Sequence, residues 1–86
     1  MHFFNPPVAM KLVEMVRAPK TNPETFAAVW EFVLAGLRKT PVDVLDRPGF
    51  IVNRVMRPYY VEAQRLALAG CSISALDAEA RAAGAP

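Results

Sequence analysis

The sequence predicts an α/β protein in which a strand–helix–strand unit of a parallel sheet is followed by helices only. Three observations predict this class. Two short apolar segments near the N-terminus have strand character. A segment with apolar residues at helical spacing separates them from a third segment of that kind. After residue 49 no further segment has the pattern of a strand.

Residues 2–4 and 11–17 are predicted to form the first two strands. The second is apolar almost throughout and carries a single acid, Glu14. A nearly continuous apolar strand is typical of burial on both faces, and a buried carboxylate is costly without a partner. Pro6 and Pro7 lack backbone donors and therefore predict a loop between the two strands.

A helix is predicted to begin at Pro23. Asn22 can cap it and proline suits the first helical position, while Thr21 and Glu24 have the spacing of a capping box as an alternative. The strand Pro41–Leu45 follows, which completes a parallel unit. The helix carries an apolar stripe that we interpret as core rather than as a ligand site: Phe26, Val29, Trp30, Val33 and Leu37.

The turn at residues 46–49, which reads DRPG, marks the change to helical structure. A long amphipathic helix is predicted over Phe50–Ala69, with Gly70 ending it. A shorter Ala-rich helix follows, for which Ser72 or Ser74 can serve as the N-cap.

Composition narrows the class of protein. Of the 86 residues, 53% are hydrophobic, which predicts that some apolar surface packs against further protein. The ten basic residues are scattered from Lys11 to Arg81, so nucleic acid is not expected as a partner. No apolar run approaches the ~20 residues that span a bilayer, so no membrane is expected either. A single cysteine, Cys71, and the lack of a signal-peptide pattern predict a cytoplasmic protein. One histidine and one cysteine provide no ligand cluster, so no metal is expected.

His2 and Glu14 are the candidates for acid–base chemistry. A neutral imidazole accepts protons near physiological pH, and it works well when a carboxylate fixes its tautomer. The two residues lie on neighbouring predicted strands and could meet at the edge of the sheet. Two alternatives stay open, since a histidine near a terminus can be incidental and Glu14 could pair with Lys11 or Arg17 instead.

Asn53 is a third candidate, because it falls in the first turns of the long predicted helix. Its amide can donate one hydrogen bond and accept another, which suits holding a carbonyl or alkoxide-like oxygen. The alternative is that Asn53 merely caps the helix or bonds to backbone near the turn.

Taken in order, these segments resemble the NAD-dependent 3-hydroxyacyl-CoA dehydrogenases. The resemblance is carried by His2–Pro6 (HFFNP), Met10–Glu14 (MKLVE), Thr40–Val42 (TPV), Arg47–Arg54 (RPGFIVNR) and Arg57–Ala63 (RPYYVEA). It covers nearly the whole chain.

The resemblance implies that His2 is the catalytic base, that Glu14 orients it, that Asn53 lies against the substrate and that Asn5 contacts the nicotinamide end of NAD. It implies oxidation of an L-3-hydroxyacyl-CoA to the 3-ketoacyl-CoA in β-oxidation or related acyl-CoA metabolism. Acyl-CoA would be the substrate, and the helical part would form a homo-oligomer such as a dimer.

The resemblance also assigns residues 1–46 to the end of a Rossmann-type NAD-binding domain and residues 47–86 to the start of a helical C-terminal domain. The chain departs from the family pattern at Asn5–Val8, which reads NPPV where the family usually has Asn-Pro-x-Pro. The Gly-rich dinucleotide fingerprint, its acidic ribose partner and the family's catalytic serine are absent from the sequence.

We therefore expect this chain to be a fragment of the enzyme, inactive by itself. The alternative function is a non-catalytic helical module for self-association or interaction.

Overall fold

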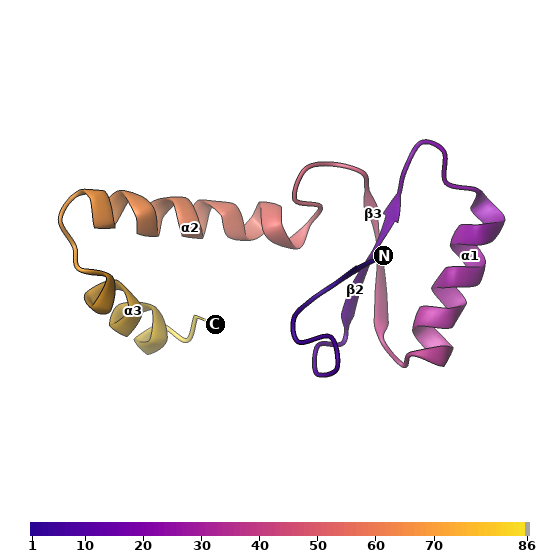
Figure 1. The fold of residues 1–86 in the computed structure, drawn as a ribbon, viewed down its shortest axis with the longest axis horizontal. Helices are drawn as coiled ribbons and strands as arrows, with labels where there is room; N and C mark the ends of the chain where they lie inside the picture. The colour runs from indigo at the N-terminus through magenta and orange to yellow at the C-terminus, as the bar shows by residue number, and fades with distance from the viewer. Residues whose placement is uncertain (86) are drawn as a thin grey trace. The chain divides into compact units, whose positions relative to one another are not determined.

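The computed structural model describes residues 1–85. They form two compact units, which divide between Asn53 and Arg54. The first unit contains a three-stranded sheet in the order β1-β2-β3, made of β1 (His2–Phe3), β2 (Leu12–Arg17) and β3 (Thr40–Leu45) (Figure 1). β1 runs antiparallel to β2 and β3 runs parallel to it. The predicted strand–helix–strand unit is thus confirmed.

The core of this unit lies between β2 and the helical segment that follows it. Val13 and Met15 of β2 are buried against Val33. The predicted helical stripe packs around them through Phe26, Val29, Trp30 and Leu37, so its assignment to the core is confirmed. Since side chains alternate along a strand, Glu14 projects to the face of the sheet opposite this core.

The helix α1 (Pro23–Glu31) begins as the sequence predicts. The Asn22 side chain accepts hydrogen bonds from the backbone amides of Glu24, at 2.8 Å, and Thr25, at 3.3 Å. Thr21 does not form the alternative capping box: its hydroxyl accepts a hydrogen bond from the Ala18 amide at 3.0 Å.

The regular helix ends earlier than the apolar stripe suggested. From Phe32 the chain continues as a π-helical turn, η1 (Phe32–Gly36), in which the Leu37 amide donates to the Phe32 carbonyl at 2.9 Å. The Phe32 ring lies over Gly36, where an added Cβ would come within 2.9 Å of it. The wider turn keeps both Val33 and Leu37 in the core.

The helices α2 (Val52–Leu68) and α3 (Ile73–Ala82) account for most of the remaining chain. α2 begins two residues later than predicted because Phe50 has a φ of 46°, outside the range of a right-handed helix. Gly70, at a φ of 106°, follows the end of α2, and Ser72 caps α3 by accepting from the Ala75 amide.

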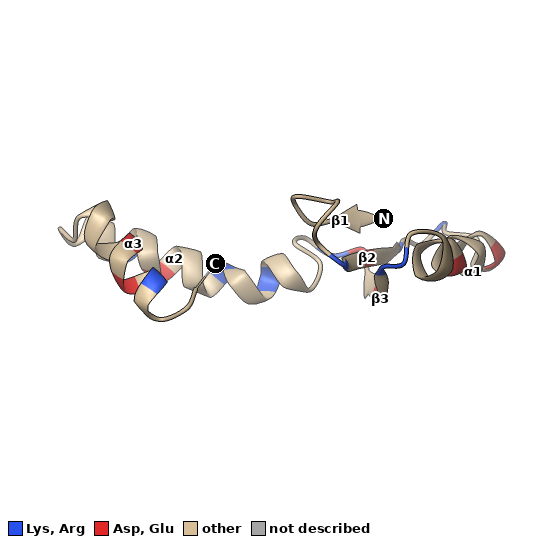
Figure 2. Ribbon diagram, turned by 90° about the horizontal axis from the view of Figure 1, so that it is seen from below, with Lys and Arg blue, Asp and Glu red and all other residues tan. Residues whose placement is uncertain are grey.

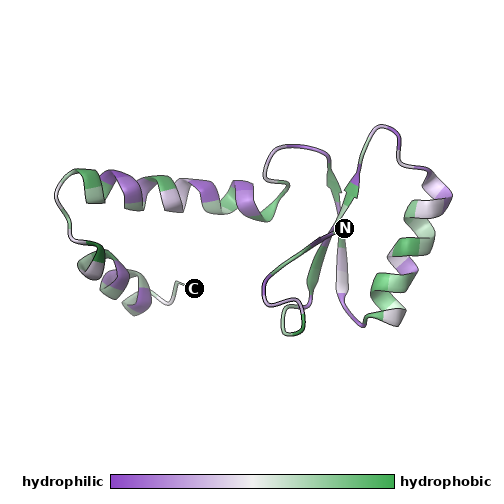
Figure 3. Ribbon diagram, in the orientation of Figure 1, coloured by the Kyte–Doolittle hydropathy of each residue, from purple (hydrophilic) through white to green (hydrophobic). Residues whose placement is uncertain are grey.

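Neither α2 nor α3 contributes a buried residue to the described part of the chain. Hydrophobic and hydrophilic bands alternate along α2 (Figure 3), and charges of both signs occur along α2 and α3 (Figure 2). Over residues 1–85, no helix combines the length and apolar character that crossing a bilayer requires.

Candidate proton-transfer site

His2 and Glu14 are direct cross-strand partners in the antiparallel pair of β1 and β2. Nδ1 of His2 lies 2.8 Å from Oε2 of Glu14. Arg17, one alternative partner of Glu14, instead bonds to Asp43 with a shortest N–O distance of 2.7 Å. The pairing of the imidazole with this carboxylate follows from the strand register, because paired residues point to the same face of a sheet.

The second oxygen of Glu14 is also occupied. Oε1 accepts hydrogen bonds from the backbone amides of Ile51, at 3.0 Å, and Val52, at 2.9 Å. These amides stand at the beginning of α2, where helical N–H groups have no partner within the helix. With only 1% of its surface exposed, Glu14 is therefore fully buried yet has partners at both oxygens.

These partners decide the charge of the carboxyl group. Burial by itself would raise the pKa of Glu14, but the hydrogen bonds from Val52, His2 and Ile51 and the nearby imidazole outweigh it and lower the pKa below the usual 4.5. Glu14 is therefore ionised at neutral pH.

An ionised carboxylate can only accept hydrogen bonds. Nδ1 of His2 must then carry the ring proton and donate a hydrogen bond to Glu14, which leaves Nε2 with a free lone pair in the neutral ring. The pair thus fixes the tautomer of a proton acceptor.

Aromatic rings flank the imidazole on two sides. The Phe4 ring lies edge-on with its centroid 5.0 Å away, and the Phe50 ring is tilted with its centroid 5.4 Å away. The side chain of His2 still keeps 33% of its surface exposed, so it remains accessible to a reacting group.

The turn before α2 brings the Phe50 ring and the helix amides to this site. Gly49 and Phe50 both have left-handed backbones, with φ values of 79° and 46°. The Phe50 amide donates to the Arg47 carbonyl at 2.9 Å, which closes the turn. Such a conformation is ordinary for glycine and unusual for a bulky residue. The sequence alone did not identify the Ile51 and Val52 amides or Phe50 as parts of the site, although Gly49 indicates a turn with a left-handed backbone.

Asn53 directly follows Val52, one of the residues whose amide binds Glu14. Its side chain is exposed, and among residues 1–85 it forms no hydrogen bond. The alternative that Asn53 caps α2 is not observed, since Glu14 bonds the first amides of that helix.

Asn5 lies in the loop between β1 and β2 and is exposed. Lys39, which directly precedes β3, holds this loop: its ammonium group donates to the carbonyl oxygens of Pro7 and Met10. The amides of Ala9 and Met10 donate to the Pro6 carbonyl. Lys39 was not among the predicted site residues, because a lone lysine in the sequence gives no sign of its partners.

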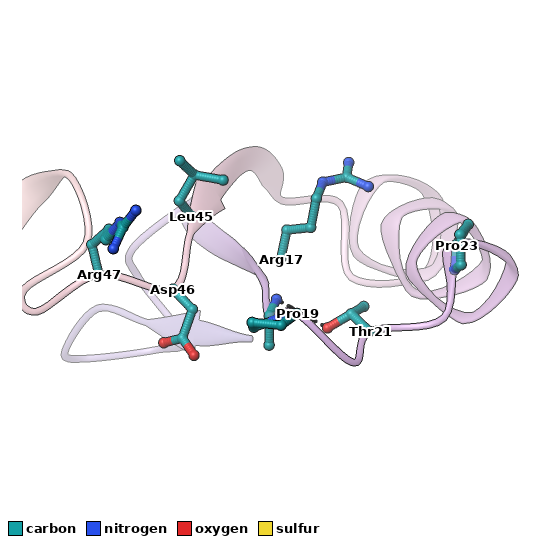
Figure 4. A pocket seen from close by; sticks show the side chains of 8 residues that line it. Arg17, Pro19, Thr21, Pro23, Leu45, Asp46 and Arg47 are labelled. Atoms are coloured by element: carbon teal, nitrogen blue, oxygen red, sulfur yellow. Dashed lines mark hydrogen bonds between the residues drawn. The ribbon is translucent and has the colours of Figure 1, made fainter.

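A hollow of about 510 Å³ opens at the carboxyl ends of β2 and β3 (Figure 4). The residues that line it are Arg17, Ala18, Pro19, Thr21, Pro23, Leu45, Asp46 and Arg47. None of the predicted site residues belongs to this set, so the hollow is distinct from the pair of His2 and Glu14.

Comparison with known proteins identifies the family of this chain. Residues 1–47 match the family model described as "3-hydroxyacyl-CoA dehydrogenase, NAD binding domain". Residues 49–86 match the model described as "3-hydroxyacyl-CoA dehydrogenase, C-terminal domain". The chain belongs to the 3-hydroxyacyl-CoA dehydrogenase family, as the sequence resemblance predicted.

Individual relatives support the assignment. The human protein named "Hydroxyacyl-coenzyme A dehydrogenase, mitochondrial" is 52% identical over 66 residues, 77% of this chain and 21% of that protein. The "Fatty acid oxidation complex subunit alpha" of Colwellia psychrerythraea is 47% identical over 77 residues, 90% of this chain and 10% of that protein.

Among solved structures, M. tuberculosis FadB2 superimposes with a TM-score of 0.78 and 39% identity, over 85% of this chain and 26% of that chain. The chain thus spans about a quarter or less of the length of the relatives and the solved structure that it matches.

Proposed function

We propose that the whole protein to which this chain corresponds oxidises an L-3-hydroxyacyl-CoA to the 3-ketoacyl-CoA with NAD, and that this chain supplies the proton-transfer pair. The observation that carries the proposal is the 2.8 Å contact between Nδ1 of His2 and a buried, ionised Glu14. Family membership supplies the reaction class.

In this proposal Nε2 of His2 accepts the proton of the substrate's 3-hydroxyl group. The imidazolium that forms is stabilised by the negative charge of Glu14, which remains ionised throughout. The Phe4 and Phe50 rings lie beside the imidazole, which stays partly exposed for contact with the substrate. The hydride chemistry of the reaction belongs to NAD.

The described residues do not by themselves fit the phosphates of a dinucleotide. The four glycines, at positions 36, 49, 70 and 84, form no Gly-rich turn before a helix. In the first turn of α1, the amides of Glu24 and Thr25 already bond to Asn22, so they are not free to bind an anion. We therefore assign to this chain the proton transfer and not the phosphate site.

Two further roles complete the proposal. Asn53 would bind the substrate, which its exposed amide beside the Glu14-bound start of α2 supports. Asn5 would contact the nicotinamide end of NAD, which its exposed place in the loop after β1 supports. We also propose the division of the chain into residues 1–46 of the NAD-binding domain and residues 47–86 of the helical domain.

The test transplants this chain into the human relative in place of the segment that it matches. The reduction of acetoacetyl-CoA by NADH is then followed through the fall in the absorbance of NADH. We expect the chimera to be active, and we expect His2→Gln to lower kcat about 10²–10⁴-fold, the usual contribution of a positioned base. Glu14→Gln should also lower kcat, because its amide NH₂ would donate to Nδ1 and move the ring proton to Nε2.

Glu31→Gln is the matched control, since Glu31 is an exposed carboxylate on α1. Its kcat should equal that of the unsubstituted chimera. A His2→Gln chimera with undiminished kcat would refute the proposal.

The isolated chain should neither bind NAD tightly nor convert acetoacetyl-CoA. Appreciable turnover of NADH by the 86-residue chain alone would contradict this assignment of roles.

We further propose that the helical part forms a homo-oligomer, such as a dimer. The support is the set of large apolar side chains that α2 exposes: Val55, Tyr59, Tyr60, Val61, Leu66 and Leu68. Size-exclusion chromatography with light scattering tests it, and a monomer at micromolar concentration would contradict it. If the chain forms a tight oligomer and the chimera has no activity, the two results together would favour the alternative function, a non-catalytic interaction module.

A cytoplasmic location stays a prediction from the sequence, and the human relative is named as mitochondrial.

A further inference from the structure

The start of α2 has no side-chain cap from its own flanking sequence. Its first amides belong to Ile51 and Val52, and both donate to Oε1 of Glu14, which is 37 and 38 residues earlier in the chain. A carboxylate at a helix N-terminus satisfies unpaired donors and interacts favourably with the helix dipole. Glu14 therefore does for α2 what an N-cap residue ordinarily does.

The backbone of Phe50 makes this contact possible. Phe50 has a φ of 46°, directly after a φ of 79° at Gly49, and the two amides that follow this left-handed pair donate to Glu14. A bulky residue with this left-handed backbone is less stable than the same residue in a right-handed conformation. Backbone strain of this kind tends to occur at functional sites.

The side chain of Phe50 contacts the other member of the pair. Its ring lies 5.4 Å from the imidazole of His2, centroid to centroid. One residue thus touches the proton acceptor with its ring and directs the helix amides to the carboxylate with its backbone.

We propose that Phe50 is a positioning residue of the proton-transfer site: its left-handed backbone makes Glu14 the cap of α2, so that one carboxylate fixes both the imidazole of His2 and the helix start that carries Asn53. The proposal rests on the function proposed above for His2 and Glu14. It adds that the charge of Glu14 and the placement of Asn53 are coupled.

The test uses NMR of the complete 86-residue chain without substrate or cofactor, so its result does not depend on the enzyme assay. Phe50→Gly removes the ring but favours the left-handed backbone. Phe50→Val keeps an apolar side chain but opposes that backbone, since a β-branched residue rarely adopts it. Phe4→Val is the matched control, because it removes the other ring beside His2 and leaves the turn unchanged.

In Phe50→Val we expect hydrogen exchange of the Ile51 and Val52 amides to rise about tenfold, as for the loss of a hydrogen bond to a charged group. Phe50→Gly and Phe4→Val should leave both amides protected. Should Phe50→Val fail to fold, Phe50→Ala supplies the same comparison with a smaller side chain. Equal protection in Phe50→Gly and in the folded Val or Ala variant would overturn the proposal.

A second readout separates positioning from general stability. As the pH falls, the chemical shifts of the Ile51 and Val52 amide protons should change over the same pH range as the shift of the side-chain carboxyl carbon of Glu14. The ¹⁵N shifts of His2 should report a proton on Nδ1 in the unsubstituted chain and a mixture of tautomers in Phe50→Val. Amide shifts that do not follow Glu14, or a tautomer unchanged in Phe50→Val, would contradict the coupling.

Discussion

β2 and α2 use their apolar residues in opposite ways. β2 buries three consecutive residues, Val13, Glu14 and Met15, whereas α2 has no buried residue in the described chain and exposes 70% of Val55. The first unit therefore contains both a small core and a charged group that the core can hold in place. The paired His2 and Glu14 thus stand on a packed strand, while the helical part contributes mainly exposed surface.

Core packing gives the largest expected contrast in stability between the two units. Met15→Ala should lower the free energy of unfolding by about 2–5 kcal/mol, because it removes a side chain that is 97% buried. Leu68→Ala should change it by less than about 0.5 kcal/mol, since Leu68 is 88% exposed. Urea unfolding followed by both Trp30 fluorescence and far-UV circular dichroism measures the two effects. Similar losses in the two variants would mean that the helical part has a core of its own.

Removing the buried carboxylate should have the next largest effect. Glu14→Ala leaves the Ile51 and Val52 amides and the imidazole of His2 without their acceptor, at an expected cost of about 1–3 kcal/mol at pH 7. The folded state lowers the pKa of Glu14. The carboxylate therefore stabilises the fold fully above pH 4.5, and this stabilisation is lost as the pH falls through the lower pKa of the folded state.

The matching control for this acid titration is Glu14→Gln, which has the same size and no charge to lose. The stability difference between the unsubstituted chain and Glu14→Gln should narrow as the pH falls from about 5 to about 2. A difference that stays constant over this range would show that the charge of Glu14 is not what stabilises the site.

Helix caps offer a smaller test of the same contrast. Asn22→Ala and Ser72→Ala each remove one capping oxygen, which costs about 1 kcal/mol in either helix. Only Asn22→Ala should shift the transition seen by Trp30 fluorescence, because α1 packs on the core of the first unit. The two-unit description would be wrong if Ser72→Ala shifted that transition equally.

Ion pairs should give the smallest effects. Arg17 and Asp43 are 2.7 Å apart and each is 44% exposed, so Asp43→Asn should change the stability only slightly. Arg65 and Glu62 are 3.8 Å apart and still more exposed, so Glu62→Gln should be nearly neutral. Unfolding at low and high salt measures both, and a large salt-independent loss in either variant would contradict these estimates.

Much of the fold follows from local patterns in the sequence. Asn22 before Pro23 predicted the start of α1 because a cap acts over only a few residues. The stripe around Val33 predicted the core because a helix face is periodic. The start of α2 was predicted two residues too early because the left-handed φ of Phe50 is unusual for a bulky residue, and because the cap of this helix, Glu14, lies far away in the sequence.

The same limit applies to the candidate site. His2 and Glu14 could be proposed as a pair because a carboxylate in an apolar strand needs a partner. The contacts of Lys39 with the loop at Pro7 and Met10 could not be predicted, because every residue has a backbone carbonyl and the sequence does not show which ones a lysine will bind. Motif order suggested roles for Asn53 and Asn5, and both roles remain predictions.

The pairing of His2 with Glu14 in the ladder of β1 and β2 limits how the loop between them can change during evolution. A slip of one residue would turn the imidazole to the other face of the sheet and separate it from its carboxylate. Substitutions in the loop are compatible with the site, as the order Pro6–Pro7–Val8 illustrates, since the pairing persists with it. Insertions and deletions in the loop are compatible with the site only where they leave this register unchanged. The loop therefore acts as a spacer in which the constraint falls on the register of the two strands and not on the loop's own side chains.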